Sequence, residues 1–351
     1  MRFSKVCISA TAVDDPPEEV TSGEIEERLR PVYEQLRLPE GRLELMTGIE
    51  RRRFYPKGTL PSEAAARAAR SLLETAPVDR SEIDAVIHCA VCRDRLEPAT
   101  AAYVHGMLGL PPSCQILDLS NACLGFVNGM VFAAGMLESG QARHVLLVAG
   151  ENGRPLLENT VATLLRGELT RKTIKPYFAN LTIGAGASAM LLSREEAVPA
   201  EAAGLRLLGG VARTDSEANR LCQGDSVAGG GQEMLTDAGA LLEAGISLAQ
   251  TAFAEFLSEL QWEASTPDCL VCHQVGRTHQ RKLLEALGLD PERDFVTYPD
   301  HGNMGSVSLP YTLHRALAAG KIGPRQRAAL LGIGSGLSTV MLGVEREGRG
   351  V

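Results

Sequence analysis

Short apolar segments alternate with longer helical patterns along almost the whole chain. The segment at residues 124–138 is nearly all apolar and rich in Gly and Ala, which indicates a helix buried on most sides. Strands that alternate with helices favour parallel sheets covered by helices, so the chain is predicted to be an α/β protein. The predicted strands are residues 84–91, 115–119, 144–149, 187–193, 205–212, 268–273, 327–332 and 338–344, with a second long helix at 238–259.

Two pairs of these predicted strands have similar sequences in the two halves of the chain. Ile83-Asp-Ala-Val-Ile-His-Cys-Ala-Val91 resembles Pro267-Asp-Cys-Leu-Val-Cys-His-Gln-Val275. In the same order, Ala187-Ser-Ala-Met-Leu-Leu192 resembles Leu337-Ser-Thr-Val-Met-Leu342. Ordered similarity of this kind indicates an ancient duplication. A polar, proline-containing segment separates the repeats, so we predict an N-terminal half at residues 1–197 and a C-terminal half at 198–351.

Composition and charge exclude several classes of protein. Hydrophobic residues make up 44% and charged residues 22%, as in an average soluble globular protein. The formal net charge of −8 argues against nucleic acid as a partner. No apolar run approaches the roughly 20 residues of a membrane span, and no secretory signal is visible at the N-terminus. The eight cysteines are therefore expected to be reduced thiols in a cytoplasmic protein.

The turn Asp118-Leu-Ser-Asn-Ala-Cys123 is the sharpest local feature. It follows a predicted strand, and Cys123 stands at the start of the buried helix. The thiolate is the nucleophilic form of cysteine, and the partial positive charge at a helix N-terminus favours it. Free backbone N–H groups there also bind a developing oxyanion. A buried core cysteine remains the alternative, because that is the usual role of an intracellular cysteine.

Three further positions have the chemistry that a cysteine nucleophile needs. His273 stands where a predicted strand ends, Asn303 lies in the Gly-rich loop His301-Gly-Asn303-Met-Gly, and Ser335 lies in Gly332-Ile-Gly-Ser-Gly336. A histidine can hydrogen-bond the thiol, while an amide and backbone N–H groups can bind enolate or oxyanion charge. Each position alone is more often structural than catalytic.

The densest positive charge is the run Arg51-Arg52-Arg53. Arginine suits phosphate, so Arg51 and Arg52 are candidate contacts for coenzyme A or a phosphopantetheine carrier. A solvated surface cluster is the alternative, since exposed arginines are common.

Two cysteine pairs have zinc-like C-x2-C spacing, Cys89 with Cys92 and Cys269 with Cys272. Both pairs lie in strand-like runs, where residues three apart point to opposite faces. We therefore predict core cysteines and no metal site.

In the charged loop after the first pair, Leu96 and Pro98 flank Glu97, so we expect a partly buried carboxylate there.

In order along the chain, Cys123, His273, Asn303 and the Gly-Ile-Gly-Ser335-Gly segment resemble the β-ketoacyl-carrier-protein synthase III branch of the thiolase superfamily. The segment Thr47-Gly-Ile-Glu-Arg51 also fits that branch. The resemblance covers essentially the whole chain. It implies a thiolase-like fold with two duplicated α-β-α-β-α-β-β halves in five layers, and a homodimer.

Within that branch the chain is most similar to OleA-type enzymes, which join two long-chain acyl-CoA molecules head to head without decarboxylation. The resemblance implies that Cys123 carries an acyl group and that the N–H groups of Cys123 and Ser335 form the oxyanion hole. His273 and Asn303 then bind the enolate, and Glu97 reaches the neighbouring subunit's active site as the base. No cofactor is permanently bound, and coenzyme A or acyl-carrier-protein thioesters are the substrates. The similar motifs are Cys92-Arg-Asp-Arg-Leu-Glu97-Pro-Ala-Thr100, Asn121-Ala-Cys123-Leu-Gly-Phe-Val-Asn-Gly-Met130 and Leu221-Cys-Gln-Gly224.

Two departures separate the chain from ordinary synthase III enzymes. The Trp and Arg that precede Thr-Gly-Ile in those enzymes are Leu45 and Met46 here, and their His-Gln-Ala-Asn is His273-Gln-Val-Gly276.

Three alternative functions stay open. They are a ketosynthase joining carrier-bound acyl or polyketide chains (by decarboxylation, or to a pyrone or diketone), an acyltransferase to an oxygen or nitrogen acceptor, and a catalytically silent scaffold subunit.

Overall fold

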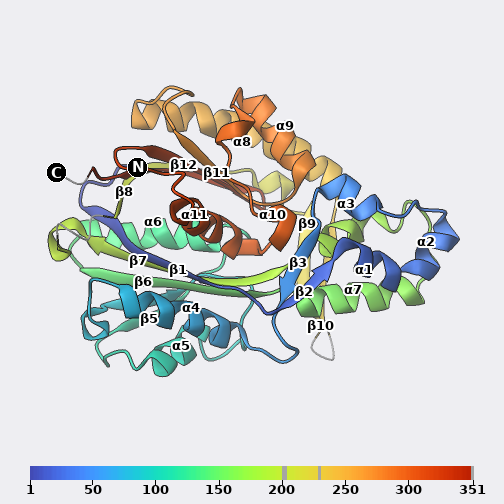
Figure 1. Cartoon of the computed structure of the whole chain (residues 1–351), viewed down its shortest axis with the longest axis horizontal. Helices are drawn as coiled ribbons and strands as arrows, with labels where there is room; N and C mark the ends of the chain where they lie inside the picture. The colour runs from blue at the N-terminus through green and yellow to red at the C-terminus, as the bar shows by residue number, and fades with distance from the viewer. Residues whose placement is uncertain (200–203, 228–230, 349–351) are drawn as a thin grey trace.

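The computed structural model describes residues 1–199, 204–227 and 231–348, and it stacks them in alternating layers of helices and strands. Figure 1 shows five layers, with α8 and α9 on one outside, α4 and α5 on the other, and α6 and α11 between two layers of strands. The α/β, thiolase-like prediction is confirmed. The layer helices are α4 (Pro61–Thr75), α5 (Thr100–Leu108), α6 (Gly125–Glu138), α8 (Ala238–Leu260), α9 (Arg277–Leu287) and α11 (Ser308–Ala318).

The strands of the two layers repeat one arrangement. The order is β5-β4-β6-β7-β1 in the first layer and β11-β12-β13-β8 in the second. In the first, β7 is antiparallel to both β6 and β1, and in the second, β13 is antiparallel to both β12 and β8. The strands are β1 (Val6–Asp14), β4 (Ala85–His88), β5 (Gln115–Asp118), β6 (His144–Asn152), β7 (Ala185–Arg194), β8 (Leu205–Thr214), β11 (Cys269–Cys272), β12 (Arg327–Gly334) and β13 (Ser338–Arg346).

The two runs of strands meet between β1 and β8, where Cys7 pairs with Arg206 and Ile8 with Leu205. The repeated order supports the proposed duplication. The proposed boundary between residues 197 and 198 falls in the connection from β7 to β8.

The middle of the molecule is built around α6. Phe126, Val127 and Met130 are completely buried, in the same cluster as residues of both strand layers. Each large apolar side chain buried in this way contributes about 1.5–3 kcal/mol. The predicted burial of this helix on most sides is therefore confirmed.

Smaller elements gather at one end of the strand layers. Residues 152–180, which have no clear periodicity, form α7 and the start of a 3-10 helix that contact the hairpin of β9 and β10. The elements here are α1 (Ser22–Arg28), α2 (Arg30–Leu36), α3 (Arg42–Thr47), α7 (Arg154–Arg166), the 3-10 helix Lys175–Thr182, α10 (Tyr298–His301), β2 (Glu18–Thr21), β3 (Arg51–Phe54), β9 (Cys222–Val227) and β10 (Gly231–Thr236).

Within the part of the chain that the structure describes, α8 is the one helix long and apolar enough to cross a membrane by length and composition. It packs against β8, β13 and α9, and its residues Ala252, Phe253 and Phe256 belong to the core beneath it. Long core helices meet the same criterion, and the contacts of α8 show that it packs within the fold.

The close contact between β6 and α4 generates a stability prediction. A Cβ on Gly150 would overlap the carbonyl oxygen of Pro61 and lie 3.1 Å from the amide nitrogen of Ala65. Because these are backbone atoms, Gly150→Ala is expected to lower the free energy of unfolding by about 1–3 kcal/mol in urea titrations. Gly135→Ala in α6 is the control, because its Cβ would meet nothing within 4 Å. There we expect a gain of about 0.5–1 kcal/mol, and equal stability of the two variants would contradict the packing argument.

Candidate active site

Cys123 lies in a tight turn between the end of β5 and the start of α6. Ala122 has a φ of 46°, an uncommon backbone conformation for alanine, and Asn121 forms a backbone bridge with Cys123. The amide of Leu124 donates to the Asn121 carbonyl at 2.9 Å, and α6 begins at Gly125. The thiol therefore stands just before the N-terminus of a buried helix, close to the predicted position, and it is only partly exposed.

The surroundings of Cys123 favour the protonated thiol at rest. Burial raises the pKa of this thiol to about 12, and the nearby Glu151 carboxylate and Cys222 act in the same direction. The nucleophile must therefore pass its proton to a base as it attacks.

Strand β12 connects this turn to His273. A Cβ on Gly334 would lie 3.5 Å from the amide nitrogen of Cys123, so β12 passes directly against the turn. One strand over, the amide of His273 donates to the carbonyl of Leu331 at 3.0 Å. The end of β11 is thereby aligned with the part of β12 that contacts the cysteine turn.

The imidazole of His273 is buried, with 6% of the residue exposed. Burial lowers its pKa to about 3, with a smaller effect from His279. A neutral imidazole carries one N–H donor and one acceptor nitrogen. This form can hydrogen-bond an enolate or thioester oxygen without adding a positive charge.

Gln274 was not anticipated from the sequence, although it directly follows the predicted His273. Its side chain is buried, and its Oε1 accepts the amides of Thr297 at 2.8 Å and Tyr298 at 3.1 Å. Its Nε2 donates to the Cys272 carbonyl at 2.7 Å. Gln274 thus fixes the end of β11 against the segment that leads to Asn303.

Asn303 is held by both its backbone and its side chain. Its amide donates to the Thr182 carbonyl, and its carbonyl accepts from Gly184, each at 2.9 Å. Its Oδ1 accepts from the amide of Gly305 at 2.9 Å, which orients the side chain. Within the described ranges the Asn303 Nδ2 donates to no protein atom, so this NH2 group is available to an acceptor on a substrate.

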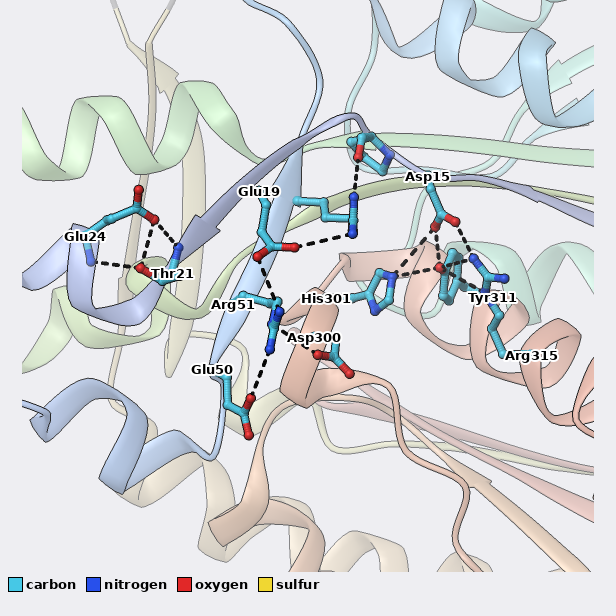
Figure 2. A network of polar contacts seen from close by, with 12 residues as sticks. Asp15, Glu19, Thr21, Glu24, Glu50, Arg51, Asp300, His301, Tyr311 and Arg315 are labelled. Atoms are coloured by element: carbon cyan, nitrogen blue, oxygen red, sulfur yellow. Dashed lines mark hydrogen bonds and ion pairs between the residues drawn. The ribbon is translucent and has the colours of Figure 1, made fainter.

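A polar network braces the loop before Asn303, as Figure 2 shows. The Nε2 of His301 lies 2.8 Å from the hydroxyl of Tyr311, and that hydroxyl donates to Asp15. Arg315, which lies on α11 like Tyr311, forms an ion pair with Asp15. The hydrogen bond to His301, with those to Tyr311 and Arg315, holds the pKa of Asp15 well below its usual range. The loop is therefore fastened between the end of β1 and α11.

The two candidate phosphate contacts have different surroundings. Arg52 is fully buried and donates to Ser22 Oγ at 3.0 Å and the Leu181 carbonyl at 2.9 Å. Side chains alternate between the two faces of β3, and that of Arg52 points into the protein. The prediction that Arg52 contacts coenzyme A is therefore replaced by a structural role.

Arg51 is half-buried on the other face of β3, where carboxylates surround it. It pairs with Glu19 at 3.4 Å and with Glu50 and Asp300 at 3.3 Å (Figure 2). Its contact with coenzyme A stays a prediction, and a phosphate there competes with these carboxylates.

Glu97 is exposed in the single chain, and its neighbour Leu96 is 96% exposed. The expectation of a partly buried carboxylate is therefore wrong for one chain, because the loop projects away from the core. The base of the loop is well anchored: Asp94 accepts the amide of Ser62 at 2.9 Å, and Asp118 accepts the amide of Thr100 at 2.7 Å.

Ser335 lies in the short turn between β12 and β13, directly after Gly334, and is partly exposed. This places its backbone one residue from the strand position that contacts the Cys123 turn. Its role in the oxyanion hole stays a prediction.

The four cysteines with zinc-like spacing are all buried, so their prediction as core residues is confirmed. Cys89 Sγ faces Gly129 of α6, and Cys92 Sγ lies 3.4 Å from the amide of Asn152. Over residues 1–199, 204–227 and 231–348, no group of three or more His, Cys, Asp or Glu side chains is placed to hold a metal ion.

Comparison with known proteins connects this geometry to a family. Residues 117–208 match the family 3-oxoacyl-[acyl-carrier-protein (ACP)] synthase III, and residues 257–345 match the family of its C-terminal region. An acyl-CoA:acyl-CoA alkyltransferase from Xanthomonas campestris is 38% identical over 341 residues, covering 97% of this chain and 98% of the relative. An enzyme of the same name from Shewanella oneidensis is 37% identical over 349 residues, covering 98% and 100%.

Solved structures give the same result. A crystal structure of Xanthomonas campestris OleA with a glutamate changed to glutamine superposes with a TM-score of 0.93 at 38% identity, covering 98% of each chain. Other crystal structures of that protein hold cerulenin, or carry a replaced cysteine or histidine. The match spans both halves of the chain.

Burial of His273 generates a pH prediction. A folded-state pKa of about 3 lies below the ordinary value of about 6.5, so unfolding takes up a proton and His273 lowers stability as pH falls below about 6.5. In NMR spectra of histidine-labelled protein, the signal missing from His273→Gln should not titrate between about pH 8 and about pH 5. The urea-unfolded chain is the control, in which every histidine should titrate near 6.5. A midpoint near 6.5 for His273 in the folded protein would refute its neutral burial.

Proposed function

The chain belongs to the family of acyl-CoA:acyl-CoA alkyltransferases, and from this membership we propose that it joins two acyl-CoA thioesters by a Claisen condensation. The observations that support the proposal are the Cys123 turn packed against β12, the buried neutral His273 at the end of the neighbouring strand β11, and the oriented side-chain amide of Asn303. This set provides a covalent acyl carrier and two hydrogen-bond donors for a thioester oxygen.

In the first proposed step, Cys123 Sγ attacks the carbonyl carbon of one acyl-CoA. Its proton is relayed through the imidazole of His273 toward the coenzyme A sulfur, so that no stable imidazolium forms in the buried site, and the tetrahedral oxyanion is bound by the backbone N–H groups of Cys123 and Ser335. The carbon–sulfur bond to coenzyme A then breaks, and the leaving thiolate takes the proton from His273. The products are acyl-Cys123 and free coenzyme A.

In the second step, another acyl-CoA must lose a proton from its α-carbon. Glu97 takes this proton, and hydrogen bonds from His273 and Asn303 stabilise the enolate oxygen. The enolate carbon attacks the acyl-Cys123 carbonyl, the carbon–sulfur bond to Cys123 breaks, and the released thiolate takes up the proton that Glu97 had removed. The product is a β-ketoacyl thioester, and hydrolysis of that thioester gives the β-keto acid. No permanently bound cofactor enters either step.

The exposure of Glu97 supports a homodimer in which it serves the partner subunit's Cys123. Strand β5 forms the free edge of the first layer, and its residues Ile116 and Leu117 are 45% and 39% exposed. An uncovered edge strand with apolar side chains favours pairing with another chain. Leu96, beside Glu97, adds a nearly fully exposed apolar side chain for a partner to cover.

A carrier-protein donor is the second candidate. The matched family descriptions name 3-oxoacyl-[acyl-carrier-protein] synthase III, which favours a ketosynthase that uses carrier-bound chains. Against this, Leu45 and Met46 stand where those enzymes carry their Trp and Arg.

We also propose a cytoplasmic location, because all eight cysteines are free thiols and a reducing compartment keeps them so.

The substrate prediction is tested with a long-chain acyl-CoA as the only substrate. Wild type should release coenzyme A and form a β-keto acid, or the ketone that arises from it by decarboxylation. Glu97→Gln should still show acyl-Cys123 by intact mass, yet lose condensation by about 10²–10⁴-fold, because its amide cannot take the α-proton.

Glu74→Gln, an exposed glutamate on the outer face of α4, is the matched control and should keep wild-type activity. Product formation only when a malonyl donor is added would exclude the glutamate-base mechanism and favour the second candidate.

The dimer prediction is tested by mixing two inactive chains. Cys123→Ala retains Glu97, and Glu97→Gln retains Cys123, so only a mixed dimer with Glu97 acting across the interface has a working site. Co-expression should therefore restore about a quarter of wild-type activity, because about half of the dimers are mixed and each has one complete site. Light scattering checks the dimer mass. No restored activity in a confirmed mixed dimer would place Glu97 in its own chain's site.

A further inference from the structure

Glu151 is a buried carboxylate at the end of β6 that the proposed reaction does not use. Only 5% of the residue is exposed. It was not anticipated from the sequence, because the predicted strand ended at residue 149, whereas β6 continues to Asn152.

The Glu151 carboxylate accepts hydrogen bonds from both halves of the chain. From the N-terminal half, the amides of Val91 and Cys92 donate to it at 3.0 Å and 3.1 Å. From the C-terminal half, Ser306 donates its Oγ at 2.7 Å and its amide at 3.3 Å. One side chain therefore binds the start of one loop and the middle of another.

Each of these loops carries a residue of the proposed mechanism. The first loop continues from Cys92 to Glu97, and the second contains Asn303. The second is joined still more closely, because Gly305 donates its amide to Asn303 Oδ1 at 2.9 Å. A Cβ on Gly305 would lie 3.1 Å from Glu151 Oε1, and its φ is 55°, so this turn is shaped around the carboxylate.

We propose that Glu151 is a positioning residue for condensation: it fixes the base of the loop that carries Glu97 toward the partner subunit's site, and it fixes the turn that orients the Asn303 amide in its own chain's site. The inference rests on the proposed function. A buried carboxylate is costly unless donors satisfy its lone pairs, and here four donors do so. An ionised carboxylate only accepts hydrogen bonds, whereas a glutamine turns an NH2 group toward donors that need an acceptor.

The charge of Glu151 also reaches Cys123. After burial, Glu151 is the largest influence that raises the pKa of the thiol, ahead of Cys222. The same carboxylate that orders the two loops therefore adds to the effect of burial in raising the pKa of the thiol. This gives a readout that a purely structural role for the side chain would not change.

The first experiment compares wild type with Glu151→Gln and Glu151→Asp, using long-chain acyl-CoA alone. In Glu151→Gln we expect condensation kcat to fall by about 100-fold, the scale of loss when reacting groups shift by about 1 Å. Acyl-Cys123 should still form, and KM should stay within a few-fold. The pH profile of Cys123 alkylation by iodoacetamide should move to lower pH, because a negative charge near the thiol has been removed.

Glu151→Asp separates charge from reach. It should keep the wild-type alkylation profile and still lose condensation, because the shorter side chain cannot bind both loops. Ser306→Ala removes one donor and keeps the carboxylate, so it should fold normally and lower kcat by a smaller factor. This variant keeps the proposal testable if Glu151→Gln does not fold.

Two results would overturn the proposal. One is condensation by Glu151→Gln or, where that chain does not fold, by Ser306→Ala, at the wild-type rate. The other is an equal loss of acylation and condensation with an unchanged alkylation profile, which is the result of general damage to the fold. A wild-type chain that acylates but does not condense acyl-CoA fails the proposed function instead, and this separates the two failures.

Discussion

The close approach of β12 to the turn at Cys123 is the contact on which the rest of the site depends. Gly332 and Gly334 both face Leu124, and a Cβ at either position would press on its side chain at 2.7 Å and 3.1 Å. Because glycine has no side chain, β12 of the C-terminal half packs directly against the start of α6 in the N-terminal half. Ser335 directly follows Gly334, and His273 is hydrogen-bonded to Leu331 of the same strand, so the position of β12 sets the positions of both.

Burial then sets the protonation states that the site begins with. The Cys123 thiol and the His273 imidazole are both uncharged at rest, since desolvation disfavours the charged form of each. Two neutral groups can be enclosed without the cost of a buried ion pair. The charged groups stand at the margins, where Asp15, Arg315 and Arg51 are paired near the solvent and hold loops in place.

The sequence predicted the parts of this protein that local patterns determine. The strands, the buried helix at α6 and the core position of the paired cysteines follow from periodicity and residue type, and the structure has them. Cys123, His273 and Asn303 were chosen as candidates because each lies at the end of a strand or in a Gly-rich turn. The contacts that depend on tertiary packing were not visible. Arg52 turned inward because alternate residues of β3 face opposite sides, and Glu97 has no covering residue within its own chain. Glu151 and Gln274 act through partners far away in sequence, so no local pattern reveals them.

The exposed edge at β5 also bears on how this protein behaves in a crowded solution. Four residues, Gln115–Asp118, present unpaired backbone groups together with two apolar side chains. Such an edge is a template for uncontrolled association when nothing covers it. The net charge of −8 provides long-range repulsion between chains, but this repulsion weakens with salt. The edge strand can then still pair with another chain. The colloidal stability of the single chain therefore depends on whether a partner covers this short strand, which also holds the base of the Glu97 loop through Asp118.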